Sequence, residues 1–215
     1  MSNCLWSFIF LGGLLGFMSL MFVFVEATSR RKKRKMDEAW QAFASLHPEL
    51  RYESTDPTDP EEGELTGTYR GVPVRVATAL RHNGENPSYL ITIFEAQLTS
   101  AMPDDLTMHQ KDWIYRLTNP FGTNDIETGD PTFDRMFVIH AAHADEAQSL
   151  LADPVVRAHL ARACKKEQEL AVVEQVVTVT MKKIVMNGPR LQQGLDVVTD
   201  AALALEDAAR TAVRT

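Results

Sequence analysis

The chain has 215 residues, with 22 Lys and Arg residues against 29 Asp and Glu residues, and a formal net charge of −7. This length is sufficient for one domain with its own hydrophobic core. Its two cysteines, Cys4 and Cys164, fall on opposite sides of the expected membrane. They therefore exclude a disulfide framework and are typical of a protein in a reducing compartment.

The first 29 residues predict a transmembrane anchor. Leu5 to Val25 carries no charged side chain, and a helix needs about 20 such residues to cross a bilayer. Lys and Arg residues mark the cytoplasmic flank of a membrane helix, and here all of them follow the apolar run. We therefore expect a single-pass protein of the cell (inner) membrane, with the N-terminus outside and residues 36–215 in the cytoplasm. A signal peptide cleaved near residues 27–29 is the alternative, which the basic flank disfavours.

Residues 30–35 form a basic collar next to this anchor. Such a cluster is a topology signal and is also suited to contact anionic lipid headgroups. The lipid bilayer is thus an expected partner, and the residues expected to contact it are Arg30, Arg31, Lys32, Lys33, Arg34 and Lys35.

Removing residues 1–35 changes the charge balance of the remainder. Taking six basic residues and Glu26 from the totals leaves 16 Lys and Arg against 28 Asp and Glu, a net charge of −12. Nucleic-acid affinity comes mostly from neutralised phosphates. We therefore expect no nucleic-acid partner.

The first half of this domain reads as one helix followed by strands. Apolar residues at helical spacing within Met36–Leu50 predict a helix that His47-Pro48 ends. Residues 53–63 are expected to form a loop. Alternation predicts a hairpin of strands 64–69 and 72–78 around Arg70-Gly71. A strand over 89–97, short strands near 106–109 and 113–117, and a loop over 119–131 follow.

The second half alternates between helices and strands. We expect a strand over 133–141, and then a helix over 144–166 that is broken at Asp153-Pro154. Residues 170–173 and 176–186 predict a second hairpin. A last helix begins near Arg190 and carries one apolar stripe that packs on a sheet or forms a short coiled coil.

This order predicts an α+β fold, in which a single N-terminal transmembrane helix precedes a mainly antiparallel sheet packed with two or three helices. The expected domains are the anchor (1–29), the basic collar (30–35) and a cytoplasmic α+β domain (36–215).

One polar cluster is a candidate for chemistry. Asp130, Asp134, His140 and His143 lie near the predicted 133–141 strand, and their side chains suit several divalent metal ions. Their spacing matches no metal-binding motif, and we favour structural roles for them at a turn and on the surface. Phosphate-binding, dinucleotide-binding and nucleophile-elbow motifs are absent from the sequence, so we expect no cofactor.

Two segments carry a family resemblance. Gly129 to Ile139 reads G-D-P-x-F-D-x-x-F-V-I, and Gly67 to Val74 reads G-x-Y-x-G-V-x-V. In both wording and order they resemble uncharacterised bacterial membrane-anchored proteins. The resemblance implies a bacterial source and no particular activity.

These observations favour a membrane-tethered interaction or scaffolding module without catalysis of its own, with a protein partner or self-association. Two alternatives stay open. One is a membrane-anchored hydrolase or metal-dependent enzyme centred on Asp130–His143. The other is a lipid or small-ligand sensor with a pocket between sheet and helix.

Overall fold

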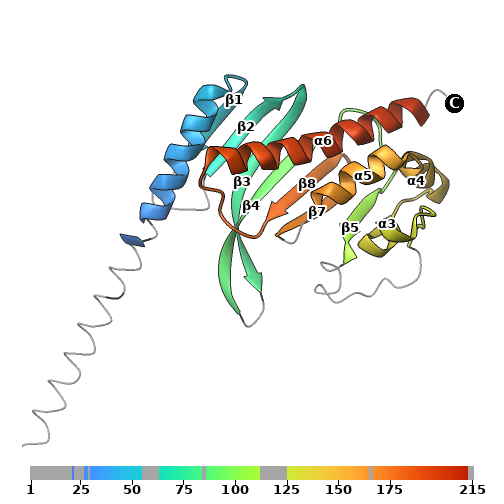
Figure 1. The fold of residues 1–215 in the computed structure, drawn as a ribbon, viewed down its shortest axis with the longest axis horizontal. Coiled ribbons are helices and arrows are strands. Elements are labelled where there is room, and N and C mark those ends of the chain that lie inside the picture. Colours follow the sequence, from blue (N-terminus) through green and yellow to red (C-terminus); the bar gives the residue numbers. More distant parts are fainter. Residues whose placement is uncertain are drawn as a thin grey trace, which may run out of the picture.

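The computed structural model describes residue 21 and residues 27–28, 30–54, 63–83, 86–111, 125–164 and 167–212. In this part of the chain the fold is α+β, as the sequence predicts. An eight-stranded sheet carries helices on one face, and the longest helix, α6 (Gly188–Ala212), crosses the sheet beside α5 (Pro154–Ala163) (Figure 1).

The sheet formed by the described residues is antiparallel at every pairing, in the order β1-β2-β3-β4-β8-β7-β5-β6. Its strands are β1 (Leu50–Ser54), β2 (Gly63–Tyr69), β3 (Val72–Asn83), β4 (Asn86–Gln97), β5 (Thr107–Gln110), β6 (Phe137–His140), β7 (Gln168–Val173) and β8 (Val176–Met181). Both predicted hairpins are present, as β2–β3 and β7–β8. The predicted strand at 113–117 lies outside the described residues, and so does most of the predicted loop at 53–63.

The core lies between the sheet and the helices. One row of facing residues runs across five strands in register, and each is at most 1% exposed: Leu65, Val76, Phe94, Val179 and Leu170. Because side chains alternate along a strand, the neighbouring residues of these strands point to the opposite face of the sheet.

Helix α6 covers this row with the apolar stripe predicted from its sequence. The six residues of the stripe are all buried: Leu191, Leu195, Val198, Ala202, Leu205 and Ala209. Gly194 is the point of closest approach, because a Cβ there would lie 2.3 Å from Cζ of Phe94. The stripe is therefore a sheet-packing face within this chain.

The prediction of a single N-terminal transmembrane helix is wrong. Among the described residues, no helix is both long enough and apolar enough to cross a membrane. The predicted location, single-pass in the inner membrane with a cytoplasmic domain, rested on that helix and is corrected with it. Residues 5–25 lie outside the described part, except for Met21.

The described helix at this end, residues 30–46, is amphipathic and packs on the protein. Met36, Trp40 and Phe43 are buried in the core, and Nε1 of Trp40 donates to the carbonyl oxygen of Val185 at 2.8 Å. The helix ends at Leu46, directly before the His47-Pro48 pair that is predicted to end it, and Leu50 begins β1, which pairs with β2 from Leu50↔Gly67 onward.

The predicted strand over 133–141 is half helix. Residues Pro131–Met136 form α3, and only Phe137–His140 form a strand, β6. Asp130 caps the helix by accepting hydrogen bonds from the backbone N–H groups of Thr132 and Phe133, and Pro131 occupies its first turn. These start signals outweigh the alternating apolar pattern of the same residues.

The predicted helix over 144–166 is broken where expected. Helix α4 (Ala144–Leu151) is followed by α5, and Asp153 accepts a hydrogen bond from the N–H of Val155 at 2.7 Å. Leu150, Leu151, Val156 and Leu160 turn into the core. These two helices extend the layer of α6 over the β5–β6 end of the sheet (Figure 1).

Candidate functional site

The two predicted acidic residues serve the start of α3. Oδ1 of Asp130 accepts from the N–H groups of Thr132 and Phe133 at 2.9 and 3.2 Å. These hydrogen bonds, together with nearby Arg157, hold the pKa of Asp130 below its ordinary value. Oδ1 of Asp134 accepts from the N–H and hydroxyl of Thr128 at 2.9 and 2.8 Å. Both carboxylates thus stabilise the turn that leads into α3.

The two predicted histidines lie elsewhere. His140 ends β6, with its Nε2 3.9 Å from Oδ1 of Asp125, and His143 precedes α4 without a side-chain capping bond. Within the described ranges, no group of three or more His, Cys, Asp or Glu residues could hold a metal ion. The structure therefore does not gather the four candidates into one constellation.

The basic collar belongs to the helix of residues 30–46. Lys33 is only 1% exposed, and its Nζ lies 3.0 Å from both the Ser54 hydroxyl and a carboxylate oxygen of Asp37. Arg34 pairs with Glu38 at 3.5 Å. One of the six residues expected to contact lipid is thus buried inside the protein.

The sheet face opposite the helices presents a mixed surface. One row across it in register consists of Ala77, Ile93, Thr180 and Glu169. The next row includes Arg75, which forms ion pairs with Glu64 at 2.6 Å and Glu95 at 3.0 Å. Apolar side chains and paired charges therefore share this face.

A hollow of about 310 Å³ opens on this face. Val173 lines it and remains 41% exposed, which is unusual for a large apolar side chain in the described part of this domain. Leu80 also borders the hollow, but it lies in the same alternating row of β3 as the helix-side residues Val76 and Thr78. The hollow draws on β3, β4, β5, β7 and β8, and its lining residues are Leu80, Arg81, Ile91, His109, Glu169, Leu170, Ala171, Val173, Thr178 and Thr180. We call it the sheet-face hollow.

Charged and titratable groups border the sheet-face hollow. Arg81 and Glu169 form an ion pair of 2.6 Å, and Nζ of Lys182 lies 3.3 Å from the other Glu169 oxygen. Burial lowers the pKa of His109, and the nearby charge of His140 lowers it further. His109 is therefore neutral at pH 7 and acts as part of the less polar wall.

Sequence reasoning missed these residues. Strand alternation predicts that most of the side chains lining the hollow lie on the sheet face away from the core. It does not predict which strands are adjacent in the sheet, and so it does not show that these side chains come together. Ala171 and Thr178 meet through a hairpin, whereas His109 reaches Ala171 through the β5–β7 pairing, across more than 60 residues of chain. The sequence signal for this hollow was that small and apolar residues occupy strand positions on the face where polar residues are expected.

Comparisons with known proteins identify the fold alone. No protein-family model matches the chain, and no curated protein matches its sequence. Among solved structures, the crystal structure of the mycobacterial trehalose monomycolate transport factor A, TtfA, superposes with a TM-score of 0.52 at 15% identity. The match covers 80% of this chain and 95% of that one. The chain therefore shares its arrangement of strands and helices with a solved structure.

Proposed function

We propose that this chain is an interaction module without catalysis of its own, and that its open sheet face docks a protein partner or a second copy of the chain. The observation that carries the proposal is the sheet-face hollow, where Val173 stays exposed beside Ile91, Ala171 and paired charges. Exposed apolar groups gathered in one hollow are characteristic of binding surfaces.

The chemistry of this face fits a protein interface. Protein interfaces combine an apolar centre with a polar rim. Here Ile91, Ala171 and Val173 supply apolar surface, and the ion pairs Arg81–Glu169 and Arg75–Glu95 stand around it. Because these charges already have partners, an apolar segment can cover the centre without stripping water from lone charges.

The fold neighbour helps to choose candidate partners. TtfA is described as a transport factor, so components of transport systems belong among the proteins to be tested beside self-association. An enzymatic role remains a hypothesis, because Asp130, Asp134, His140 and His143 serve separate elements of the described structure.

The test compares two surfaces of the full-length chain. Ala171→Glu and Val173→Glu place charges in the sheet-face hollow. Val155→Glu is the matched control, because Val155 is 57% exposed on α5, in the helix layer. Self-association is measured by sedimentation velocity, and partner capture is measured by quantitative pull-down with equal amounts of each folded variant.

We expect Ala171→Glu and Val173→Glu to lose the association that the wild type and Val155→Glu retain. Burying one uncompensated carboxylate at an interface costs several kcal/mol, which corresponds to at least a hundredfold loss of affinity. A wild-type chain that is monomeric and captures no stoichiometric partner contradicts the proposal. So does a pattern in which all three variants bind as well as the wild type.

A further inference from the structure

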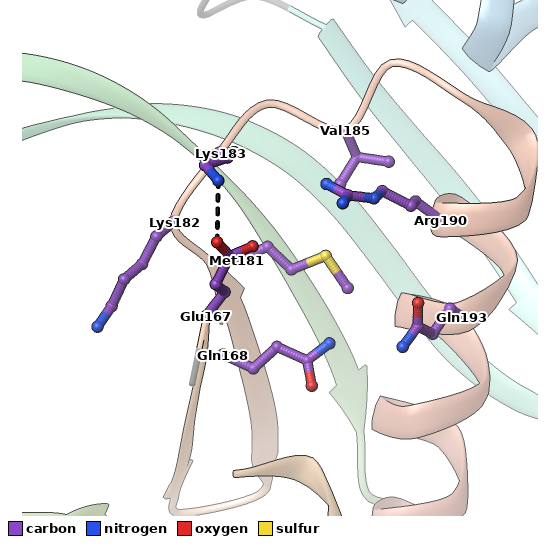
Figure 2. Close-up of a pocket in the computed structure, with 8 residues that line it drawn as sticks. All are labelled: Glu167, Gln168, Met181, Lys182, Lys183, Val185, Arg190 and Gln193. Atoms are coloured by element: carbon purple, nitrogen blue, oxygen red, sulfur yellow. Dashed lines mark hydrogen bonds and ion pairs between the residues drawn. The ribbon is translucent and has the colours of Figure 1, made fainter. Parts of the chain in front are cut away.

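A second hollow, of about 270 Å³, lies between the end of the β7–β8 hairpin and the start of α6 (Figure 2). Its walls come from β7, the end of β8, the link at 182–187 and the first turns of α6. The lining residues are Glu167, Gln168, Met181, Lys182, Lys183, Val185, Arg190 and Gln193. We call it the helix-start pocket.

Gln168 is the buried polar group of the helix-start pocket. The residue is only 7% exposed, and its Oε1 has no hydrogen-bond partner in the described part of the chain. Figure 2 shows the side chain extending from β7 into the pocket, toward Gln193 of α6. A buried amide oxygen without a partner is unfavourable, so the pocket holds an acceptor that suits a ligand N–H or O–H group.

The charge of the helix-start pocket is opposite to that of the domain around it. Lys182, Lys183 and Arg190 line it, with Glu167 as its acidic member. Lys183 pairs with Glu167 at 2.9 Å, and Lys182 pairs with Glu169 at 3.3 Å. Because Lys183 is paired and the Lys182 side chain points away from the pocket (Figure 2), the surplus of positive charge there comes from Arg190, in a region, residues 36–215, whose net charge is −12.

Arg190 supplies the positive charge that is available to a ligand. Its guanidinium makes no hydrogen bond or ion pair with the described residues, although it stands on an acidic protein. Asn187 caps the helix by accepting from the Arg190 N–H at 2.9 Å. The start of α6 also contributes the positive end of a 25-residue helix.

The link that forms one wall of the pocket is held in place before any ligand arrives. The N–H of Val185 donates to the Thr92 hydroxyl at 2.9 Å, and that hydroxyl donates to the carbonyl oxygen of Lys183 at 3.2 Å. Trp40 of the first helix donates to the carbonyl oxygen of Val185 at 2.8 Å. A wall fixed in this way loses little conformational entropy on binding.

We propose that the helix-start pocket binds a small organic anion that also carries a hydrogen-bond donor, in the manner of a hydroxycarboxylate or a phosphorylated polyol. The guanidinium of Arg190 binds the carboxylate or phosphate, beside the positive end of α6. Gln168 accepts the hydrogen bond of the ligand hydroxyl, and Met181 and Val185 contact its carbon skeleton. The helix-start pocket is thus a specific candidate site for the small-ligand sensor function considered from the sequence. The proposal does not depend on protein docking at the sheet-face hollow.

The test is calorimetric titration of the full-length chain, in a buffer free of phosphate and carboxylate, with two matched pairs of probes. Malate and succinate differ by one hydroxyl, and glycerol 3-phosphate and inorganic phosphate differ by a hydroxylated carbon skeleton. We expect the hydroxylated member of each pair to bind about tenfold more tightly, the effect of one satisfied hydrogen bond.

The variants test separately the part of the site that binds the anion and the part that binds the ligand hydroxyl. Arg190→Gln should weaken all four anions by about tenfold or more, because it removes a charge-assisted contact. Gln168→Leu should abolish the preference for malate over succinate. Gln193→Ala removes the exposed amide that lines the same pocket opposite Gln168. Arg51→Gln is the control, because Arg51 lies on β1 and its side chain is 81% exposed.

Urea denaturation of each variant shows whether it is folded. The proposal is overturned if none of the four probes binds the wild-type chain at millimolar concentration. It is also overturned if folded Arg190→Gln binds them as the wild type does, or if the hydroxyl preference survives Gln168→Leu.

Discussion

The contact between α6 and the sheet depends on the absence of a side chain at position 194. A Cβ there would lie 2.3 Å from Cζ and 2.4 Å from Cε1 of Phe94, whereas carbon atoms pack at about 3.5–4.0 Å. Phe94 is fully buried and stands in register between Val76 and Val179. Its ring therefore has no free space into which it can move.

We predict that Gly194→Ala destabilises the protein although alanine is the better helix former. Replacing glycine within a helix is worth about 1 kcal/mol in favour of the variant. Overpacking a filled core costs about 1–3 kcal/mol and occasionally more. With an overlap of more than 1 Å against a buried ring, the upper part of that range applies, and a net loss of about 1–2 kcal/mol follows.

The assay is urea denaturation of the full-length chain, followed by circular dichroism. Gly188→Ala is the control, because a Cβ there would meet Cδ2 of Phe43 at 3.7 Å, an ordinary contact, and its unfolding free energy should equal or exceed that of the wild type. Adding Phe94→Leu to Gly194→Ala should recover part of the loss. A Gly194→Ala protein as stable as Gly188→Ala would refute the close packing of α6 on β4.

Three further predictions concern polar groups. Burial alone would raise the pKa of Glu206, but hydrogen bonds from the N–H and hydroxyl of Thr99 at 2.6 and 2.7 Å, and the charge of Arg210, lower it. The ionised Glu206 therefore stabilises the fold at pH values above its pKa in the unfolded chain, about 4.5, and this stabilisation is lost as the pH falls through the folded pKa. The unfolding free energy of Glu206→Gln should accordingly fall less steeply than that of the wild type between about pH 5 and pH 3. Gln168→Leu should raise the unfolding free energy of the unliganded chain by about 1 kcal/mol, because it removes an unpartnered buried oxygen, and an unchanged midpoint in urea would argue against that. Burial raises the pKa of the Cys164 thiol to about 12. In a Cys4→Ser variant, which leaves Cys164 as the one thiol, the native protein should react with a thiol reagent at pH 8 far more slowly than the urea-unfolded chain, whereas equal rates would show that Cys164 is accessible.

Local periodicity predicted the elements whose neighbours are near in sequence. The β2–β3 hairpin and the break at Asp153-Pro154 are set by turn and cap residues, so the sequence shows them directly. The stripe of α6 was equally clear, because one buried helix face needs one repeating spacing.

Elements that depend on distant partners were missed or misread. Residues Leu50–Ser54 form β1 by pairing with β2. Leu50 and Tyr52 alternate with Arg51 and Glu53, but this run of five residues is too short to identify a strand without its partner. In residues 133–136 an alternating apolar pattern competed with the cap at Asp130, and the cap prevailed. The membrane helix was inferred from hydropathy and the one-sided basic flank, without any test of what the neighbouring helix packs against.

The candidate sites were hidden for the same reason. Gln168 and Arg190 stand 22 positions apart, and they meet only because the β7–β8 hairpin returns the chain to the start of α6. The acidic and histidine cluster near residue 130 looked richer in the sequence. In the structure Asp130 caps α3, Asp134 bonds Thr128 in the turn before it, and His140 ends β6.

The most direct test of the docking surface is hydrogen–deuterium exchange of the full-length chain, measured free and in its associated state. The associated state is the purified complex with its partner or, for self-association, the protein at high concentration. The account predicts slower exchange on association in peptides from β4, β7 and β8 that carry the sheet-face hollow, with α4 and α5 unchanged. Protection confined to α4 and α5, with these strands unchanged, would contradict it.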